Sequence, residues 1–173
     1  MIQNNICVYA AHTNLDNLKD GVNGILCQKL GIINTNILRP LNGHPEIGAG
    51  MIGCLANPID SNQYLQQVKK TLNIPYIRTN GMERNAISKI AVCGGSGSFL
   101  TGDAIAAGAD MLLTSDLKYH DFQNADNKII LADIGHYESE QYAKEIIYSK
   151  ILEKFGKFAC VISKSTHGYA HYI

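Results

Sequence analysis

The chain has 173 residues, of which 46% are hydrophobic and 17% are charged, and its 15 basic residues balance 15 acidic ones. This length and composition are typical of a globular protein with one medium domain or two small ones. The balanced charge and the absence of a Lys/Arg block argue against a nucleic-acid or membrane-surface partner.

Five cysteines are scattered along the chain without any CxxC pair. An odd number of scattered cysteines is typical of buried thiols in a reducing compartment. No apolar run approaches the roughly 18 residues of a membrane span, and the start of the chain lacks the basic residues and long apolar core of a signal peptide. We therefore expect a cytoplasmic protein without a membrane partner.

A strand and a helix are the first elements that the sequence predicts. Residues 6–11 (ICVYAA) form the strand candidate, and a polar turn follows at residues 12–16. Spaced apolar residues predict a helix over residues 18–30, which ends at Gly31 as a C-cap. Asp16 lies where an N-cap would lie, so helix capping and a functional role both remain open for it.

The middle of the chain predicts a hairpin, a helix and a short strand. Strand candidates at residues 36–41 and 50–55 are joined by the polar loop 42–46. Asp60 is the expected N-cap of the helix that follows. The next strand is expected around residues 76–78.

A glycine-rich turn at residues 94–98 (GGSGS) follows the strand predicted over residues 87–93. Such a turn can bind an anion through backbone N–H groups, but this one lacks the third glycine of a dinucleotide loop and the Lys-Ser/Thr of a P-loop. A tight turn with close backbone packing is the favoured interpretation. Strands and helices alternate from here onward, which predicts a largely parallel sheet.

A short strand at residues 111–114 ends in the polar stretch 115–122, and the next strand candidate covers residues 129–132. A helix pattern follows, with apolar residues four apart up to Phe155. A last strand is predicted over residues 158–163.

The apolar face of that helix, continued backwards by one turn, carries His136 and Glu140. An imidazole and a carboxylate four residues apart can share a metal ion or a proton, and ligands usually bind at strand ends in α/β proteins. Chance is the competing interpretation, because two other histidine–carboxylate pairs in the chain have the same spacing.

Four stretches together resemble one family along nearly the whole chain. In this order they resemble the Nif-three-like proteins, often labelled GTP cyclohydrolase one, type two homologues. The resemblance implies two α/β lobes with a dinuclear divalent-metal site between them, often in a toroidal hexamer. The stretches are residues 8–16 (VYAAHTNLD), 92–98 (VCGGSGS), 114–120 (TSDLKYH) and 133–140 (DIGHYESE).

The resemblance also implies a set of site residues. By position in the motifs, Asp16 corresponds to the metal ligand of the first lobe, while His136 and Glu140 correspond to the ligands on the helix, with Glu140 bridging two ions. His12 and His120 match polar residues of the same cavity. This mixed nitrogen and oxygen ligand set suits Zn, Mn, Fe or Co. The donor atoms of the three ligands should lie within about 5 Å of a common point.

The chain also departs from the family pattern. Family members carry a further segment before the HTNLD motif, with a His-His-Pro stretch that supplies two more ligands, whereas this chain contains no His-His pair. The resemblance therefore implies an α/β fold of two lobes with mixed, largely parallel sheets. Residues 1–31 and 133–173 would form an incomplete first lobe, and residues 32–132 a middle lobe. Expected partners are further copies of the chain, a separate N-terminal fragment and a small-molecule substrate.

The function that the resemblance implies is a metal-dependent hydrolase of the GTP cyclohydrolase one, type two kind. Two metal ions bridged by Glu140 would activate a water, with His12 or His120 as the proton carrier. The alternative is a non-catalytic oligomeric scaffold or regulatory module with a vestigial metal site. If the DNA just upstream encodes His-His-Pro in the same reading frame, this would favour the hydrolase over the scaffold.

Overall fold

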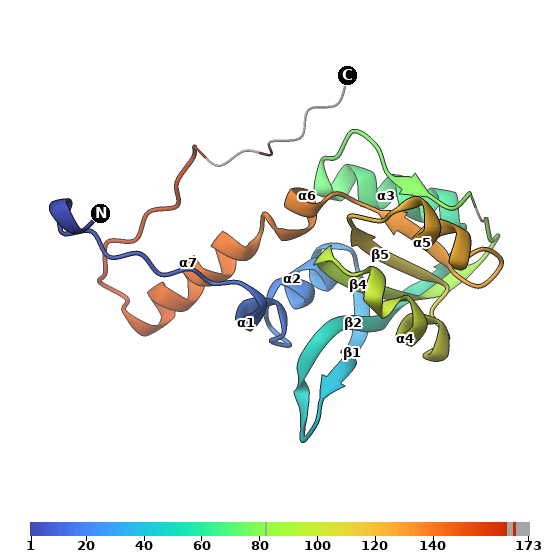
Figure 1. The fold of residues 1–173 in the computed structure, drawn as a ribbon, viewed down its shortest axis with the longest axis horizontal. Helices are drawn as coiled ribbons and strands as arrows, with labels where there is room; N and C mark the ends of the chain where they lie inside the picture. Colours follow the sequence, from blue (N-terminus) through green and yellow to red (C-terminus); the bar gives the residue numbers. More distant parts are fainter. Residues whose placement is uncertain (82, 166–167, 169–173) are drawn as a thin grey trace.

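The computed structural model describes residues 1–81, 83–165 and 168 (Figure 1). The strands are β1 (Ile32–Leu41), β2 (His44–Ile59), β3 (Arg78–Thr79), β4 (Ile87–Ser96), β5 (Met111–Ser115) and β6 (Ile130–Asp133). The α-helices are α1 (Thr13–Asp16), α2 (Val22–Lys29), α3 (Ser61–Leu72), α4 (Thr101–Ala106), α5 (Tyr119–Asn124), α6 (His136–Glu140) and α7 (Ala143–Lys154). Two short 3₁₀ turns, η1 and η2, cover Ile2–Asn4 and Ser98–Leu100.

The described strands form one six-stranded sheet in the order β1-β2-β4-β5-β6-β3. β4, β5 and β6 are parallel to one another, and the crossovers between them contain α4 and α5. The other neighbours pair antiparallel: β1 with β2 through a tight hairpin, β2 with β4, and the short β3 with β6 at the edge. The α/β class and the mixed sheet are therefore confirmed, and the strands from residue 87 onward are parallel to one another as predicted. In the sheet as described, two neighbour pairs are parallel and three are antiparallel.

The central strands are buried on both faces, since successive side chains of a strand point to opposite sides of the sheet. Ile90 and Val92 of β4 pack in a cluster with buried apolar residues of α2 and α3, among them Leu26 and Tyr64. Ala91, between them, packs in the cluster on the other face, with residues of α4 and of the segment after α5. β5 and β6 show the same alternation. Each fully buried aliphatic side chain contributes about 1.5–3 kcal/mol.

Helix α3 begins as the sequence predicts. The Asp60 side chain accepts hydrogen bonds from the backbone N–H groups of Asn62 and Gln63, both at 3.0 Å. Tyr64, Val68 and Leu72 lie on its buried face with at most 2% exposure. The capped start and this face together fix α3 against the sheet.

Two predicted strands are not formed. Residues 6–11 and 158–163 lie outside the strands of the structure, and both segments are largely exposed. A strand needs a hydrogen-bonded neighbour, and no described strand pairs with either segment. The prediction of strands here was wrong because it considered apolar content and not pairing.

The long helix predicted after Gly135 is interrupted. It divides into α6 and α7 at residues 141–142. The expected apolar face is only partly covered: Ile146 is buried, but Ile147 is 40% exposed and Phe155, just after α7, is 54% exposed. The N-terminal segment and α7 extend beyond the sheet on the same side of the molecule (Figure 1). The division into lobes at residues 31 and 132 stays a prediction.

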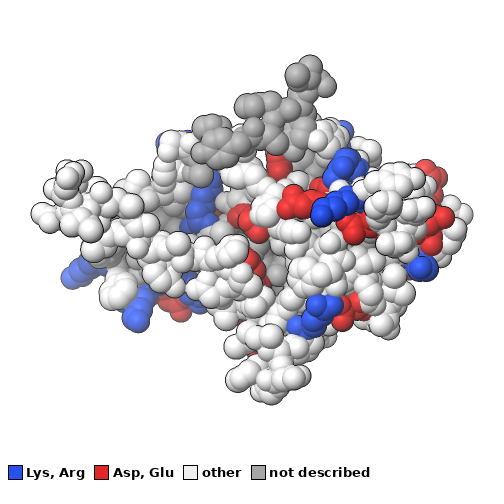
Figure 2. Space-filling model, viewed as in Figure 1, with Lys and Arg blue, Asp and Glu red and all other residues white. Residues whose placement is uncertain are grey.

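Lys and Arg side chains are scattered over the face shown in Figure 2 and form no continuous basic patch among its described atoms. In the described part of the chain, no helix has both the length and the apolar character to cross a membrane. All five cysteines are free. Cys27 and Cys93 are buried as expected, but Cys7 is exposed on the N-terminal segment, so the expectation that every thiol is buried was wrong.

Candidate metal centre

The candidate site lies at the carboxyl ends of the parallel strands β5 and β6. Asp116 directly follows β5, and His136 begins α6 soon after β6. The two strands are paired with Thr114 opposite Asp133, so the segments that leave them lie close together. This edge of a parallel sheet is where α/β proteins usually bind ligands.

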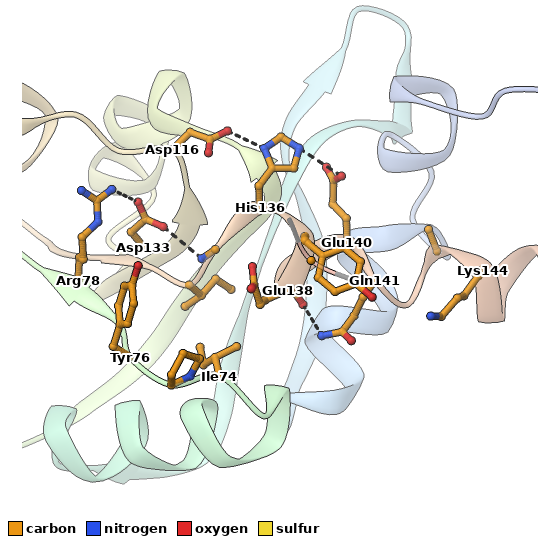
Figure 3. Close-up of a pocket in the computed structure, with 16 residues that line it drawn as sticks. Ile74, Tyr76, Arg78, Asp116, Asp133, His136, Glu138, Glu140, Gln141 and Lys144 are labelled. Atoms are coloured by element: carbon orange, nitrogen blue, oxygen red, sulfur yellow. Dashed lines mark hydrogen bonds and ion pairs between the residues drawn. The ribbon is translucent and has the colours of Figure 1, made fainter. Parts of the chain in front are cut away.

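The imidazole of His136 lies between two carboxylates (Figure 3). Its Nδ1 is 2.6 Å from Asp116 Oδ2, and its Nε2 is 3.3 Å from Glu140 Oε2. A proton on Nδ1 that is donated to Asp116 leaves the Nε2 lone pair directed at the Glu140 side. This is the arrangement found in metal sites, where a carboxylate orients a ligating histidine through its other nitrogen. The predicted pairing of His136 with Glu140 is present.

The surroundings of His136 and Glu140 shift the pKa values of both side chains. Burial lowers the pKa of His136, but the hydrogen bond to Asp116 and the charges of Glu140 and Asp116 outweigh burial, so the pKa is raised overall. Burial raises the pKa of Glu140, against the lowering effect of the His136 charge. The negative charge of Asp16 raises the pKa of Glu140 further, which places Asp16 within electrostatic range of the pair.

Asp16 ends α1 and does not cap the following helix. The N-cap of α2 is Gly21, so the capping alternative for Asp16 is wrong. Burial raises the pKa of Asp16, while the charges of His12 and His136 lower it. Its backbone carbonyl accepts a hydrogen bond of 3.0 Å from the side chain of Asn23, which is 2% exposed.

The glycine-rich turn packs directly against the candidate site. Asn23 Oδ1 accepts a hydrogen bond from the N–H of Gly94 at 2.8 Å, and Ser139 Oγ accepts one from the N–H of Gly95 at 2.9 Å. Both N–H groups are therefore used within the protein and do not face an anion. These bonds agree with the close backbone packing that was favoured, although residues 94–96 belong to β4 and the turn begins later than predicted. Asn23 and Ser139 join this segment to the segments that carry Asp16 and His136.

Gly95 leaves room for the Glu140 carboxylate. It has a φ of +63°, and a Cβ there would lie 2.2 Å from Glu140 Oε1 and 3.2 Å from His136 Nε2. Any other residue would occupy the space into which these donor atoms point. An imidazole and carboxylates are donors of the kinds that bind Zn, Mn, Fe or Co, so the chemistry of these side chains suits such an ion.

The two histidines expected as proton carriers lie in different places. His12 is the N-cap residue of α1, and its charge lowers the pKa values of both Asp16 and Glu140. His120 lies on α5, where its ring contacts Tyr119 and its Nδ1 is 3.2 Å from Gln123 Oε1. His12 therefore belongs to the electrostatic surroundings of the site, whereas the contacts of His120 are local to α5.

Convergence of Asp16 with the His136–Glu140 pair stays a prediction. Among the residues with described positions, no three His, Cys, Asp or Glu side chains are grouped closely enough to hold one ion. Buried Cys93 is close to the same charges, and its burial and the charges of Asp16 and Glu140 raise its pKa to about 12. It is therefore a neutral thiol and a poor ligand at neutral pH.

A cleft of about 780 Å³ adjoins the pair (Figure 3). His136, Glu140 and Asp116 line one part of it, and mostly apolar residues, among them Ile74 and Tyr76, line another. A cleft of this size can admit a small molecule beside the candidate metal ligands.

Three residues of the site were not found as site residues from the sequence. Asp116 stands in a motif of the resemblance but was assigned no role, because its spacing from His120 is one of the chance pairs and its partner His136 lies 20 residues away. Asn23 and Ser139 lie inside predicted helices and carry no recognisable signal. Each of these three side chains has a partner that is far away in the sequence and becomes a neighbour only in the folded protein.

Fold and site together define the class: a mixed α/β protein with a histidine–carboxylate cluster at the carboxyl ends of its parallel strands. Residues 1–168 match the family model described as Duf34/NIF3 (NGG1p interacting factor 3). The chain belongs to this family, which confirms the resemblance stated from its four motifs.

Relatives and solved structures agree with this assignment. A Streptococcus pneumoniae protein named GTP cyclohydrolase 1 type 2 homolog is 36% identical over 151 residues, which are 84% of this chain and 56% of that protein. A Clostridium perfringens protein of the same name is 32% identical over 157 residues, 89% of this chain and 59% of that protein. The chain thus spans little more than half the length of these relatives.

Two crystal structures share the fold. A hypothetical protein of Staphylococcus aureus superposes with a TM-score of 0.84 at 26% identity, over 98% of this chain and 70% of that chain. A Bacillus cereus protein related to NIF3 superposes with a TM-score of 0.82 at 22% identity, over 90% of this chain and 69% of that chain. The fold of the longer proteins therefore extends beyond the part that corresponds to this chain.

Proposed function

We propose that this chain contributes the helix-side ligands of a divalent-metal centre that serves a hydrolytic reaction. The observation that carries the proposal is the imidazole of His136, which lies between Asp116 and Glu140 beside a glycine that leaves space for the donor atoms. The name GTP cyclohydrolase 1 type 2 homolog, borne by its relatives, supports a hydrolytic role.

Each residue has a part in this proposal. Asp16, His136 and Glu140 would hold the ion, and Asp116 orients His136 through Nδ1. When bound, a divalent ion supplies Lewis acidity and lowers the pKa of a water molecule. His12, beside Asp16 and Glu140, takes up a proton, and the adjoining cleft receives the substrate.

We also propose that the complete centre needs a further part of the fold. The chain covers 56% of the pneumococcal relative, and three ligands on this chain can support one ion better than two. A segment corresponding to the uncovered part of such relatives, in the same polypeptide or in a separate one, would supply the remaining ligands. The exposed apolar N-terminal segment favours self-association into a homo-oligomer.

Hydrolysis assays test this proposal. GTP and a phosphate ester are offered to the chain alone and to the chain co-expressed with the segment of the pneumococcal relative that it does not cover. We expect negligible turnover by the chain alone, and turnover by the assembled protein that Glu140→Gln abolishes and His44→Gln, in the distant hairpin, leaves intact. Turnover that survives Glu140→Gln would contradict the proposed ligand set.

A further inference from the structure

Asp133, the last residue of β6, is a buried carboxylate with three donors. It is 7% exposed, its Oδ1 accepts the N–H of Gly135 at 3.1 Å, and its Oδ2 accepts the N–H of Leu117 at 3.1 Å. Arg78, its partner across the β3–β6 pair, forms an ion pair with the same Oδ2. A buried carboxylate with this many charge-assisted hydrogen bonds is held in one orientation.

These bonds act on the two segments that meet at the candidate metal centre. Leu117 follows Asp116, and Gly135 precedes His136. Arg78 Nη2 also donates to the carbonyl of Leu117 at 2.9 Å, so Arg78 and Asp133 together bind both backbone polar groups of Leu117.

The backbone at Asp116 needs such support. Its φ of +57° lies in the left-handed region, which costs a residue other than glycine of the order of 1 kcal/mol and persists where surrounding contacts enforce it. This conformation accompanies the placement of Asp116 Oδ2 against His136 Nδ1.

We infer that Asp133, clamped by Arg78, is a positioning residue: it holds Asp116 against His136 and thereby keeps the proton on Nδ1 and the lone pair on Nε2. Asp133 does not touch the reacting atoms in this scheme and acts through its neighbours. The inference rests on the proposed metal centre for its purpose, but the contacts it concerns are all between residues of this chain.

The test measures the tautomer of His136 and zinc affinity separately. Side-chain ¹⁵N chemical shifts of metal-free protein are recorded at about pH 9, well above the ordinary histidine pKa of about 6.5. We expect the Nδ1–H tautomer in the native chain and a mixture of tautomers in Asp133→Asn. The zinc affinity of Asp133→Asn should be about 10-fold or more lower than that of the native chain, because loss of a group that orients a metal ligand typically has this effect. Arg78→Gln, at a half-exposed position, should show the same changes to a smaller extent.

The chain contains a matched control. Asp110 also pairs with an arginine, Arg84, and accepts two backbone N–H groups, from Ser88 and Lys89, but it lies at the opposite end of β5. Asp110→Asn should destabilise the protein and leave the tautomer and zinc affinity unchanged.

The outcomes separate the two proposals. A native Nδ1–H signature retained in both Asp133→Asn and Arg78→Gln, or an Nε2–H form in the native chain, would overturn the positioning role. The expected tautomer changes without zinc binding by any variant would support the positioning role and contradict the metal centre. If Asp133→Asn does not fold, Arg78→Gln decides.

Discussion

At the scale of single residues, the position of the Glu140 carboxylate in the candidate site depends on a glycine, Gly95. Gly95 combines a positive φ with a space that Glu140 Oε1 fills, so an added methyl group must displace the carboxylate. We expect Gly95→Ala to lower zinc affinity at least 10-fold, by analogy with the loss of a group that orients a ligand. Isothermal titration measures this change.

Gly108 provides the control for that substitution. Its φ is +72°, but nothing lies within 4 Å of an added Cβ, so Gly108→Ala meets the same backbone strain without a steric contact. Gly108→Ala should lose about 1–2 kcal/mol of stability in urea unfolding, and Gly95→Ala should lose more because the steric contact adds to the backbone strain. Equal zinc affinities in the two variants would show that Gly95 matters only for its backbone.

Asp110 gives a prediction about pH. Burial raises its pKa, but hydrogen bonds from the Lys89 and Ser88 N–H groups and from Arg84 outweigh burial and lower the pKa below 3.8. A folded-state pKa below the unfolded one gives stability that is present above the unfolded value and lost as pH falls through the folded value. Asp110→Asn should therefore cost about 1–3 kcal/mol near neutral pH. The difference from the native chain should shrink below about pH 4 in urea unfolding, and a constant difference down to pH 2 would contradict this prediction.

The sequence could predict part of the candidate site. His136 and Glu140 share one helical turn, so their pairing follows from spacing, and motif resemblance named Asp16. The contact between Asp116 and His136 could not be predicted by spacing, because it depends on the register of β5 and β6. His120 was named through the family resemblance, but its contacts in the structure are with Tyr119 and Gln123 of its own helix.

At the scale of elements, the sequence predicts a helix or strand well when neighbouring residues determine it. It predicts strands poorly when their formation depends on a partner strand far away in the chain. The Asp60 cap and the hairpin each follow from residues close together in the chain, and the apolar runs of the central strands could be recognised one at a time. Residues 6–11 have strand composition without a neighbour. Apolar content alone cannot tell whether a partner strand is present.

Hydrogen exchange tests the state of this segment. The backbone N–H groups of residues 7–11 have no backbone acceptor among the described residues, so we expect them to exchange without protection in the isolated chain. The N–H groups of β5, in the sheet centre, serve as the protected reference. Protection of residues 7–11 at low protein concentration would show that they are paired in a way the structure lacks.

At the scale of the whole molecule, apolar side chains lie uncovered at one side. Ile6 and Val8 are 54% and 66% exposed on the N-terminal segment, and Phe155 and Phe158 are 54% and 62% exposed after α7. Contiguous exposed apolar surface favours association between molecules. The extra length of the relatives gives a second way to cover it, by a further part of the fold.

Light scattering across a wide concentration range measures this association. We expect the apparent mass of the isolated chain to rise with concentration and the double variant Ile6→Ser/Val8→Ser to reduce the rise. Phe99→Ser, at a 53% exposed position next to α4, should leave it unchanged. A constant monomer mass for the native chain would contradict the prediction.

Metal analysis of the purified chain after dialysis tests the central claim, that Asp16, His136 and Glu140 are the metal ligands of this chain. With first-shell ligands limited to these three, the chain should retain at most one weakly held divalent ion, and His136→Gln should remove it while His44→Gln does not. Two tightly held ions on the chain alone, or a metal content that His136→Gln leaves unchanged, would contradict the ligand set.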